Sequence, residues 1–254
     1  MADTTGSPSR RRFFKGLSLI PVVAVSLPGC SPNTDTEARA PDAPAGAPGS
    51  MGNTQTANAT GEAYRPTFFN ADEWRFVHAV CERLIPADEH GPSAIEAGVP
   101  EFLDRHMQTP YAAGDIWYMQ GPFLEASSDF GYQGRLPLRD ILRVGMRAFD
   151  THARNTFGGK TFAELEPAQQ EGMLRDADGN KLKLDDISAK VFFNNLLAET
   201  RNGYFADPSH GGNRDMGPWK MIGYPGMRGD YLDWVEVRDR PYSLPAVDLS
   251  GRRA

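Results

Sequence analysis

The chain has 254 residues and a formal net charge of −6, from 27 Lys and Arg against 33 Asp and Glu. Both signs are spread along the chain, which argues against a nucleic-acid partner, because such proteins gather basic side chains opposite the phosphates. The 26 Gly and 20 Pro indicate many loops. The C-terminal stretch of about 190 residues is long enough for one domain with its own core.

The first 30 residues have the pattern of a bacterial export signal. Arg10 and Arg11 lie in the basic stretch 9–15, ahead of an apolar run over residues 17–25. Paired arginines followed by Phe and Lys are typical of the twin-arginine signal, which exports proteins that are already folded. The apolar run is shorter than the roughly 20 residues that span a bilayer, so we expect a removable or lipid-modified leader. The alternative is a chance basic N-terminus before a buried helix.

The residues Leu27-Pro28-Gly29-Cys30 resemble a lipobox, the motif whose Cys becomes the lipid-bearing first residue of a mature lipoprotein. Because Pro28 is unusual in this motif, lipidation of Cys30 and simple removal of the leader both remain open. In either case Cys81 has no partner within the chain, so we expect no internal disulfide. The helical core spacing of Cys81 favours an inert buried thiol over a reactive one or one that pairs with another subunit.

Residues 31–63 consist mainly of Ala, Pro, Gly, Thr, Asn and Ser, with almost no large apolar side chain. Such a segment buries too little surface to offset the entropy lost when it becomes ordered. We therefore predict a disordered linker, which would let an anchored domain stand clear of the membrane.

Residues 64–254 are predicted to form a single irregular, mainly α-helical domain. Apolar side chains recur there at three- and four-residue steps, without the sustained alternation that would indicate strands. An Asn70-x-x-Glu73 capping box and Pro86 mark the two ends of the first helix. The expected helices are residues 71–85, a short one after Val99-Pro100, 115–119, 137–157, a short one after Glu166-Pro167, and 185–200. Helices packed on helices are the expected architecture.

The amino-acid composition changes after Thr200. Residues 204–231 are too rich in Gly and Pro for a helix and too rich in aromatic residues for disorder. We expect a long ordered coil at this end of the domain. Its aromatic side chains must pack either on this domain or on another subunit, because Tyr, Trp, Met and Arg are enriched at subunit interfaces.

The motifs of several enzyme and cofactor classes are missing from the sequence. It contains no Cys-x-x-Cys-His for covalent haem, no Gly-x-Gly-x-x-Gly for a dinucleotide, no Gly-x-Ser-x-Gly and no His-Glu-x-x-His. Residues 176–180 begin like a calcium loop, but Gly and the last carboxylate are misplaced, so we expect a turn between helices. His210, beside Asp207 and Asp215, is the candidate for contact with a substrate or cofactor, including one held by a partner.

Two blocks of the chain resemble the gluconate 2-dehydrogenase subunit 3 family. The first is residues 82–99, ERLIPADEHGPSAIEAGV, in which Ser93 stands where the family often has Gly. The second combines residues 203–208, 211–215 and 219–226. Shorter matches lie at 120–123 and 131–133, so the resemblance covers residues 66–231. The twin-arginine leader is also typical of this family.

The resemblance implies an accessory role in a membrane-associated periplasmic complex. Family members accompany a large flavoprotein of the glucose–methanol–choline oxidoreductase type, which holds FAD and oxidises gluconate or a related sugar or polyol. A multihaem cytochrome c subunit then passes electrons to the quinone pool. The flavoprotein would leave the cell interior through the twin-arginine translocase together with the small subunit. The resemblance therefore implies no cofactor in this chain, with FAD and c-type haem in its partners.

Within this reading, the C-terminal coil supplies much of the contact with the flavoprotein, because buried aromatics and Arg dominate interface energetics. The candidate anchors are Trp219, Tyr224, Tyr204, Phe205 and Arg214. Their alternative role is packing on the helices of this chain. Two other classes of function stay open: a stand-alone exported enzyme that uses His210 with Asp207 or Asp215, and a structural lipoprotein or export chaperone.

Overall fold

The computed structural model describes residues 64–124 and 126–254. The predicted export signal with Arg10 and Arg11, the lipidation site Cys30 and the linker 31–63 lie outside the described residues. The described part is mainly α-helical and contains no β-strand, only isolated bridges such as the one between Gly226 and Val247. The predicted fold class is therefore confirmed.

The first helix, α1 (Ala71–Leu84), begins with the capping box predicted from the sequence. The Asn70 side chain accepts hydrogen bonds from the backbone N–H groups of Asp72 and Glu73, and the Glu73 carboxylate accepts one from the Asn70 N–H. These bonds satisfy donors that the first helical turn leaves free. α1 ends two residues before Pro86, as expected.

The next two helices are short. α2 (Val99–His106) starts directly after Gly98, whose φ of 77° a side chain disfavours. α3 (Pro110–Ala113) is capped by the Thr109 hydroxyl and ends at Gly114, at φ 81°. The helix predicted over residues 115–119 is wrong, because Gly114 in the left-handed region ends the helix just before that stretch.

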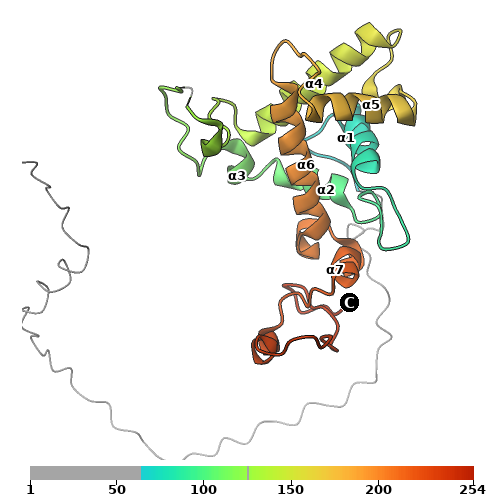
Figure 1. Ribbon diagram of the computed structural model, residues 1–254, viewed down its shortest axis with the longest axis vertical. Coiled ribbons are helices and arrows are strands. Elements are labelled where there is room, and N and C mark those ends of the chain that lie inside the picture. Colours follow the sequence, from blue (N-terminus) through green and yellow to red (C-terminus); the bar gives the residue numbers. More distant parts are fainter. Residues whose placement is uncertain (1–63, 125) are drawn as a thin grey trace, which may run out of the picture. The chain divides into compact units, whose positions relative to one another are not determined.

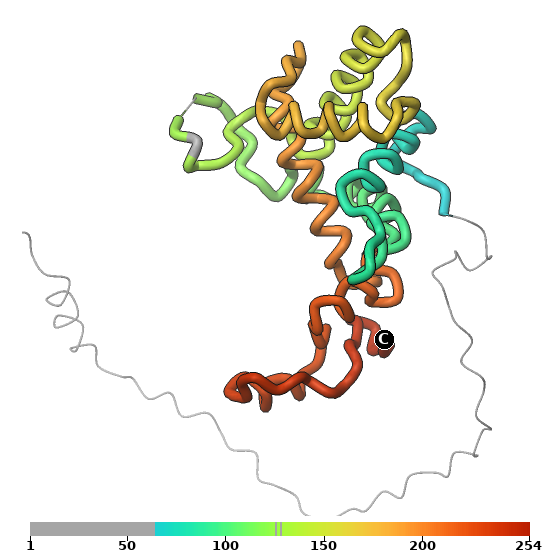
Figure 2. The backbone as a smooth tube through the Cα atoms, turned by 45° about the vertical axis from the view of Figure 1, so that its right-hand side comes forward, coloured from blue at the N-terminus to red at the C-terminus, as the bar shows by residue number. Residues whose placement is uncertain are grey.

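The three longest helices of the described chain are α4 (Leu138–Thr156), α6 (Ala189–Phe205) and α1, and α5 (Pro167–Asp178) completes the helical core. In Figures 1 and 2, α6 runs through the middle, and it contacts α1, α2, α4 and α5. At the crossing of α4 and α6, Gly145 lies against the Phe192 ring so closely that a Cβ at position 145 would overlap it. The Phe192 ring also packs against Phe76 and Phe149 at the centre of the core.

Helix α6 begins four residues later and ends five residues later than predicted, because the Ser188 side chain caps it and Gly203 lies inside it. A side chain at position 203 would collide with the Phe102 ring, so close packing of α6 on α2 explains this glycine. The turn predicted over residues 176–180 is only partly present, because residues 176–178 are the end of α5 and the chain turns at Gly179 and Asn180, the latter at φ 54°. No helix in the described part of the chain is long and apolar enough to cross a membrane.

The stretch 204–231 is not one coil. After α6 it contains three short 3-10 helices and one α-helix: η4 (Pro208–His210), η5 (Arg214–Met216), α7 (Gly217–Ile222) and η6 (Gly229–Trp234). Pro at the start of η4 and α7 and left-handed Gly at their ends delimit these elements. The Gly and Pro residues, which were expected to prevent helix formation here, instead mark the ends of very short helices.

Candidate functional site

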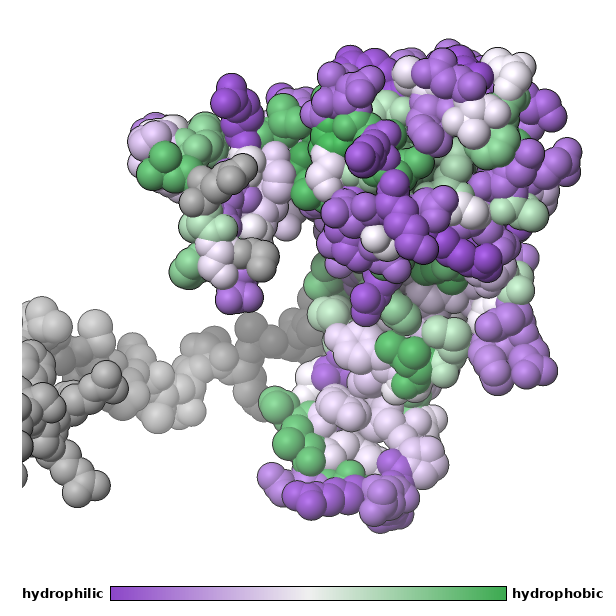
Figure 3. All heavy atoms as spheres, turned by 45° about the horizontal axis from the view of Figure 1, so that its top comes forward, coloured by the Kyte–Doolittle hydropathy of each residue, from purple (hydrophilic) through white to green (hydrophobic). Residues whose placement is uncertain are grey.

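A loop between α3 and α4 exposes more aromatic surface than any helix of the core. We call residues 114–136 the aromatic loop. Its exposed large apolar side chains are Ile116, Trp117, Tyr118, Phe123, Leu124, Phe130 and Tyr132, of which Tyr118 is 84% exposed. Figure 3 shows hydrophobic side chains gathered on this loop, on the left of the view. Single exposed apolar residues are ordinary, whereas a gathered set marks a binding surface.

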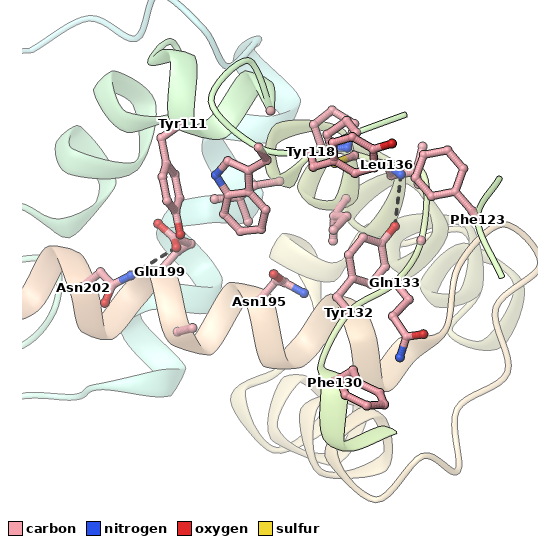
Figure 4. Close-up of a pocket in the computed structure, with 18 residues that line it drawn as sticks. Tyr111, Tyr118, Phe123, Phe130, Tyr132, Gln133, Leu136, Asn195, Glu199 and Asn202 are labelled. Atoms are coloured by element: carbon pink, nitrogen blue, oxygen red, sulfur yellow. Dashed lines mark hydrogen bonds between the residues drawn. The ribbon is translucent and has the colours of Figure 1, made fainter. Parts of the chain in front are cut away.

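A pocket of about 480 Å³ lies between the aromatic loop and α6. Its walls include Tyr111, Trp117 and Tyr132. Its polar floor comes from α6, where Asn195, Glu199 and Asn202 are spaced by four and three residues and so share one helix face. In Figure 4, Tyr111 points toward Glu199, and Asn195 lies further along α6 toward Tyr132.

Glu199 is the buried ionisable group of this pocket, only 4% exposed. Its Oε1 accepts a hydrogen bond of 3.1 Å from the Asn202 amide, whereas Oε2 has no hydrogen-bond donor and lies 3.3 Å from His106 Nε2. Burial raises the pKa of Glu199 to about 7, although the Asn202 bond opposes the shift. Burial, and to a lesser extent the charge of His210, lowers the pKa of His106. Burial therefore disfavours the charged form of both groups.

Two of the candidate anchors are covered by this chain itself. Trp219 is 3% exposed, packs with Met216 and Ala246, and donates its indole N–H to the Phe205 carbonyl over 2.9 Å. Tyr204 is also buried, and its hydroxyl donates to the Pro92 carbonyl. In the described structure Trp219 ties the C-terminal segment to α6, and Tyr204 ties α6 to the segment before α2. Both rings therefore serve the alternative role left open by the sequence.

Arg214 likewise has partners within the chain. Its guanidinium lies 3.5 Å from the buried Glu101 carboxylate, and its backbone N–H donates to the Ala97 carbonyl. Phe205 and Tyr224, in contrast, are exposed. These two are the aromatic anchors that keep part of their surface, 38% and 40%, available to a partner.

The chain end carries a second set of exposed apolar side chains, which we call the C-terminal apolar surface. It consists of Met221, Ile222, Tyr224, Met227, Tyr231, Leu232, Val235, Val237, Leu244 and Leu249. Figure 3 shows part of it as hydrophobic spheres in the lower half of the view. The sequence predicted partner contacts from the coil 204–231 and named Tyr224 in it, but it did not identify the exposed apolar residues beyond 231 or the aromatic loop. The available signal was the presence of large apolar residues in segments without helical spacing.

The described structure does not form a catalytic pair from His210 and Asp207. His210 is exposed on η4, whereas the Asp207 carboxylate accepts hydrogen bonds from the backbone N–H groups of Ser209 and Leu249, at 3.0 and 2.8 Å. Asp207 thus caps η4 and fixes the chain end. Within residues 64–124 and 126–254, no three His, Cys, Asp or Glu side chains are grouped as metal ligands would be.

The model of the gluconate 2-dehydrogenase subunit 3 family matches residues 71–226. The chain belongs to this family. The match begins with the first residue of α1 and includes the aromatic loop, the Glu199 pocket and α7. Membership of the subunit 3 family places the chain in a multi-subunit, membrane-associated dehydrogenase complex. Neither the curated proteins nor the solved structures give a significant match.

Proposed function

We propose that this protein is the small, non-catalytic subunit of a gluconate 2-dehydrogenase-type complex and that it binds and stabilises the flavoprotein subunit. The observation that carries this proposal is the pair of exposed apolar surfaces, the aromatic loop and the C-terminal apolar surface, on a chain of this family. Covering such side chains stabilises a complex by roughly 25 cal/mol for each Å² of apolar area removed from water. The flavoprotein is the partner that would cover them.

In this assignment the chemistry belongs to the partners. The flavoprotein holds FAD and oxidises gluconate or a related sugar or polyol, and a cytochrome c subunit with c-type haem receives the electrons. The exposed His210 faces outward from η4 and is the residue of this chain that would approach the partner's active site. Of the five anchors, Phe205 and Tyr224 would contact the flavoprotein directly, while Trp219, Tyr204 and Arg214 would shape the segment that presents them.

The N-terminal segment supports export as part of the same proposal. Arg10 and Arg11 would direct the chain, with the folded flavoprotein bound, through the twin-arginine translocase to the periplasm. Cys30 would then carry a lipid that holds the complex at the membrane.

Gentle solubilisation of native membranes and capture of the C-terminally tagged chain test this proposal. A large partner with flavin absorbance, a c-haem signal and gluconate-dependent dye reduction are expected with the native chain. The variants Tyr118→Ala and Leu232→Ala should lower flavoprotein yield at least severalfold, because each removes an exposed apolar group. Lys160→Ala, at an exposed turn away from both surfaces, is the matched control and should leave yield unchanged. Recovery of the native chain alone would overturn the assignment.

A further inference from the structure

The pocket between the aromatic loop and α6 combines aromatic walls with an acidic floor. Tyr111, Trp117, Tyr118 and Tyr132 contribute ring faces or edges. Glu199 is the one carboxylate among the lining residues, and none of them is a Lys or Arg. The site therefore has negative character, from the ring faces and from a carboxylate, without a basic side chain of its own to balance it.

The Glu199 carboxylate has unused acceptor capacity. Oε2 is buried without a hydrogen-bond donor, and His106 Nε2 lies 3.3 Å from it. A buried polar atom that lacks a partner destabilises a structure by about 1 to 3 kcal/mol. A donor entering the pocket would remove that penalty.

We propose that this pocket receives an arginine side chain of the flavoprotein subunit. The inference rests on the proposed function and names the chemistry of one contact within it. A guanidinium is planar, stacks on aromatic rings and donates several hydrogen bonds in one plane. It would stack on Trp117 or Tyr111 and donate to the amide oxygen of Asn195 and the carboxylate of Glu199, which line the pocket together.

A neutral planar ring is the competing occupant, and charge decides against it. It would fill the aromatic walls, but whenever Glu199 is ionised it would leave that carboxylate without a counter-charge in a region removed from water. Such an uncompensated charge is strongly disfavoured. A cation meets both requirements of the site, because ring faces attract it and the carboxylate neutralises it.

Cation binding in this pocket would depend on pH. A bound guanidinium favours the ionised form of Glu199, so binding releases a proton when Glu199 is protonated in the free protein. The titratable groups around it are His106 on α2, Tyr111 on α3 and, behind His106, His210 on η4. The affinity for a cationic probe is therefore expected to rise between pH 6 and pH 8.

The test titrates the full-length purified chain with N-acetyl-arginine amide at constant ionic strength, followed by saturation transfer in NMR. N-acetyl-citrulline amide, which has the same shape without the charge, is the matched probe. Saturable binding of the arginine probe at least tenfold tighter than the citrulline probe is expected. Glu199→Gln should reduce the affinity for the arginine probe about tenfold, and Trp117→Ala should weaken binding severalfold, with the fold checked by circular dichroism. Glu171→Gln, at an exposed pair on α5, is the charge control and should bind normally.

Equal binding of the two probes, or arginine binding that survives both pocket variants, would overturn the inference. The complex provides the second measurement, because capture of Glu199→Gln from native membranes should recover about tenfold less flavoprotein than capture of Glu171→Gln. If Glu199→Gln recovers as much flavoprotein as Glu171→Gln, the proposed arginine contact is wrong, but the proposed accessory function is not affected. If the native chain recovers no flavoprotein, the proposed function fails, whereas the probe titration still reports on the pocket.

Discussion

The helical core and the two apolar surfaces differ in how their large side chains are covered. Around α6, rings such as Phe76, Phe149 and Phe192 are fully buried and pack on one another. On the aromatic loop and the C-terminal apolar surface, side chains of similar size such as Tyr118 and Leu232 remain 84% and 78% exposed. Large apolar side chains are therefore buried in the helical core and exposed on the two surfaces of the same chain.

In the helical core, apolar side chains are buried by contacts within the chain, whereas on the two apolar surfaces they are not. The core gains its stability from contacts within the chain, so changes there should appear as changes in the free energy of unfolding. The two surfaces gain nothing until a partner covers them, so changes there should appear in complex formation. The following predictions test that separation, beginning with the largest expected change in stability.

Asp104→Ala should destabilise the protein by about 3 kcal/mol, because several donors lose their acceptor at once. The buried Asp104 carboxylate accepts hydrogen bonds from the backbone N–H groups of Thr67, Phe68 and Phe69 and from the Tyr64 hydroxyl. Burial alone would raise the pKa of Asp104, but these bonds outweigh it and lower the pKa. Its contribution is therefore present above the unfolded-state pKa and is lost as the pH falls through the folded-state pKa.

Urea denaturation of the native chain and Asp104→Ala at pH 7 and pH 3 measures this contribution. The gap in unfolding free energy should narrow at the lower pH. A gap of the same size at both pH values would contradict the role of the ionised carboxylate.

Gly145→Ala should destabilise the core by about 1 to 3 kcal/mol, the range for overpacking. The added methyl would overlap the Phe192 ring where α4 crosses α6. Gly172→Ala on α5 is the matched control, because a Cβ there meets nothing within 4 Å. That change should stabilise the protein by about 0.5 to 1 kcal/mol through helix propensity. Thermal unfolding followed by circular dichroism distinguishes the two, and equal effects would mean that the helix crossing is not tightly packed.

Glu199→Gln should change stability with the opposite pH dependence to Asp104. Because burial raises the pKa of Glu199 from an ordinary 4.5 to about 7, the folded state holds its proton more tightly than the unfolded state. This group's contribution is fully present below the unfolded-state pKa and is lost as the pH rises through the folded-state pKa. Relative to the native chain, Glu199→Gln should be near neutral at pH 4.5 and more stable by roughly 3 kcal/mol at pH 8.

Chemical denaturation across this pH range checks the sign for Glu199. A variant whose stability relative to the native chain is the same at pH 4.5 and pH 8 would show that Glu199 titrates normally in the fold.

Tyr118→Ala and Leu232→Ala should change the unfolding free energy by less than about 0.5 kcal/mol, the usual range for surface positions. Trp219→Ala is the informative contrast, because Trp219 is buried and bonds to Phe205 within the chain. It should weaken association with the flavoprotein and also speed limited proteolysis of the C-terminal end. If Tyr118→Ala or Leu232→Ala unfolds the domain, these side chains contribute to the core, and the distinction between the core and the two apolar surfaces is wrong.

The helical class and most helix starts can be predicted from the amino-acid sequence alone. Local signals are enough for these features, because Asn70 and Glu73 cap α1 within four residues, and the apolar spacing of α4 repeats over its whole length. The family resemblance was also readable from residues 82–99 and the C-terminal block, and the family match over residues 71–226 confirms it.

Which aromatic residues pack in the fold and which remain exposed depends on the three-dimensional arrangement of the chain. Trp219 and Tyr224 are five residues apart and similar in character, yet one is buried against Phe205 and the other faces outward. The Glu199 pocket also required the fold, because its walls come from the aromatic loop and its floor from α6, more than 60 positions later in the chain. Burial depends on contacts between distant segments, and a local pattern does not contain them.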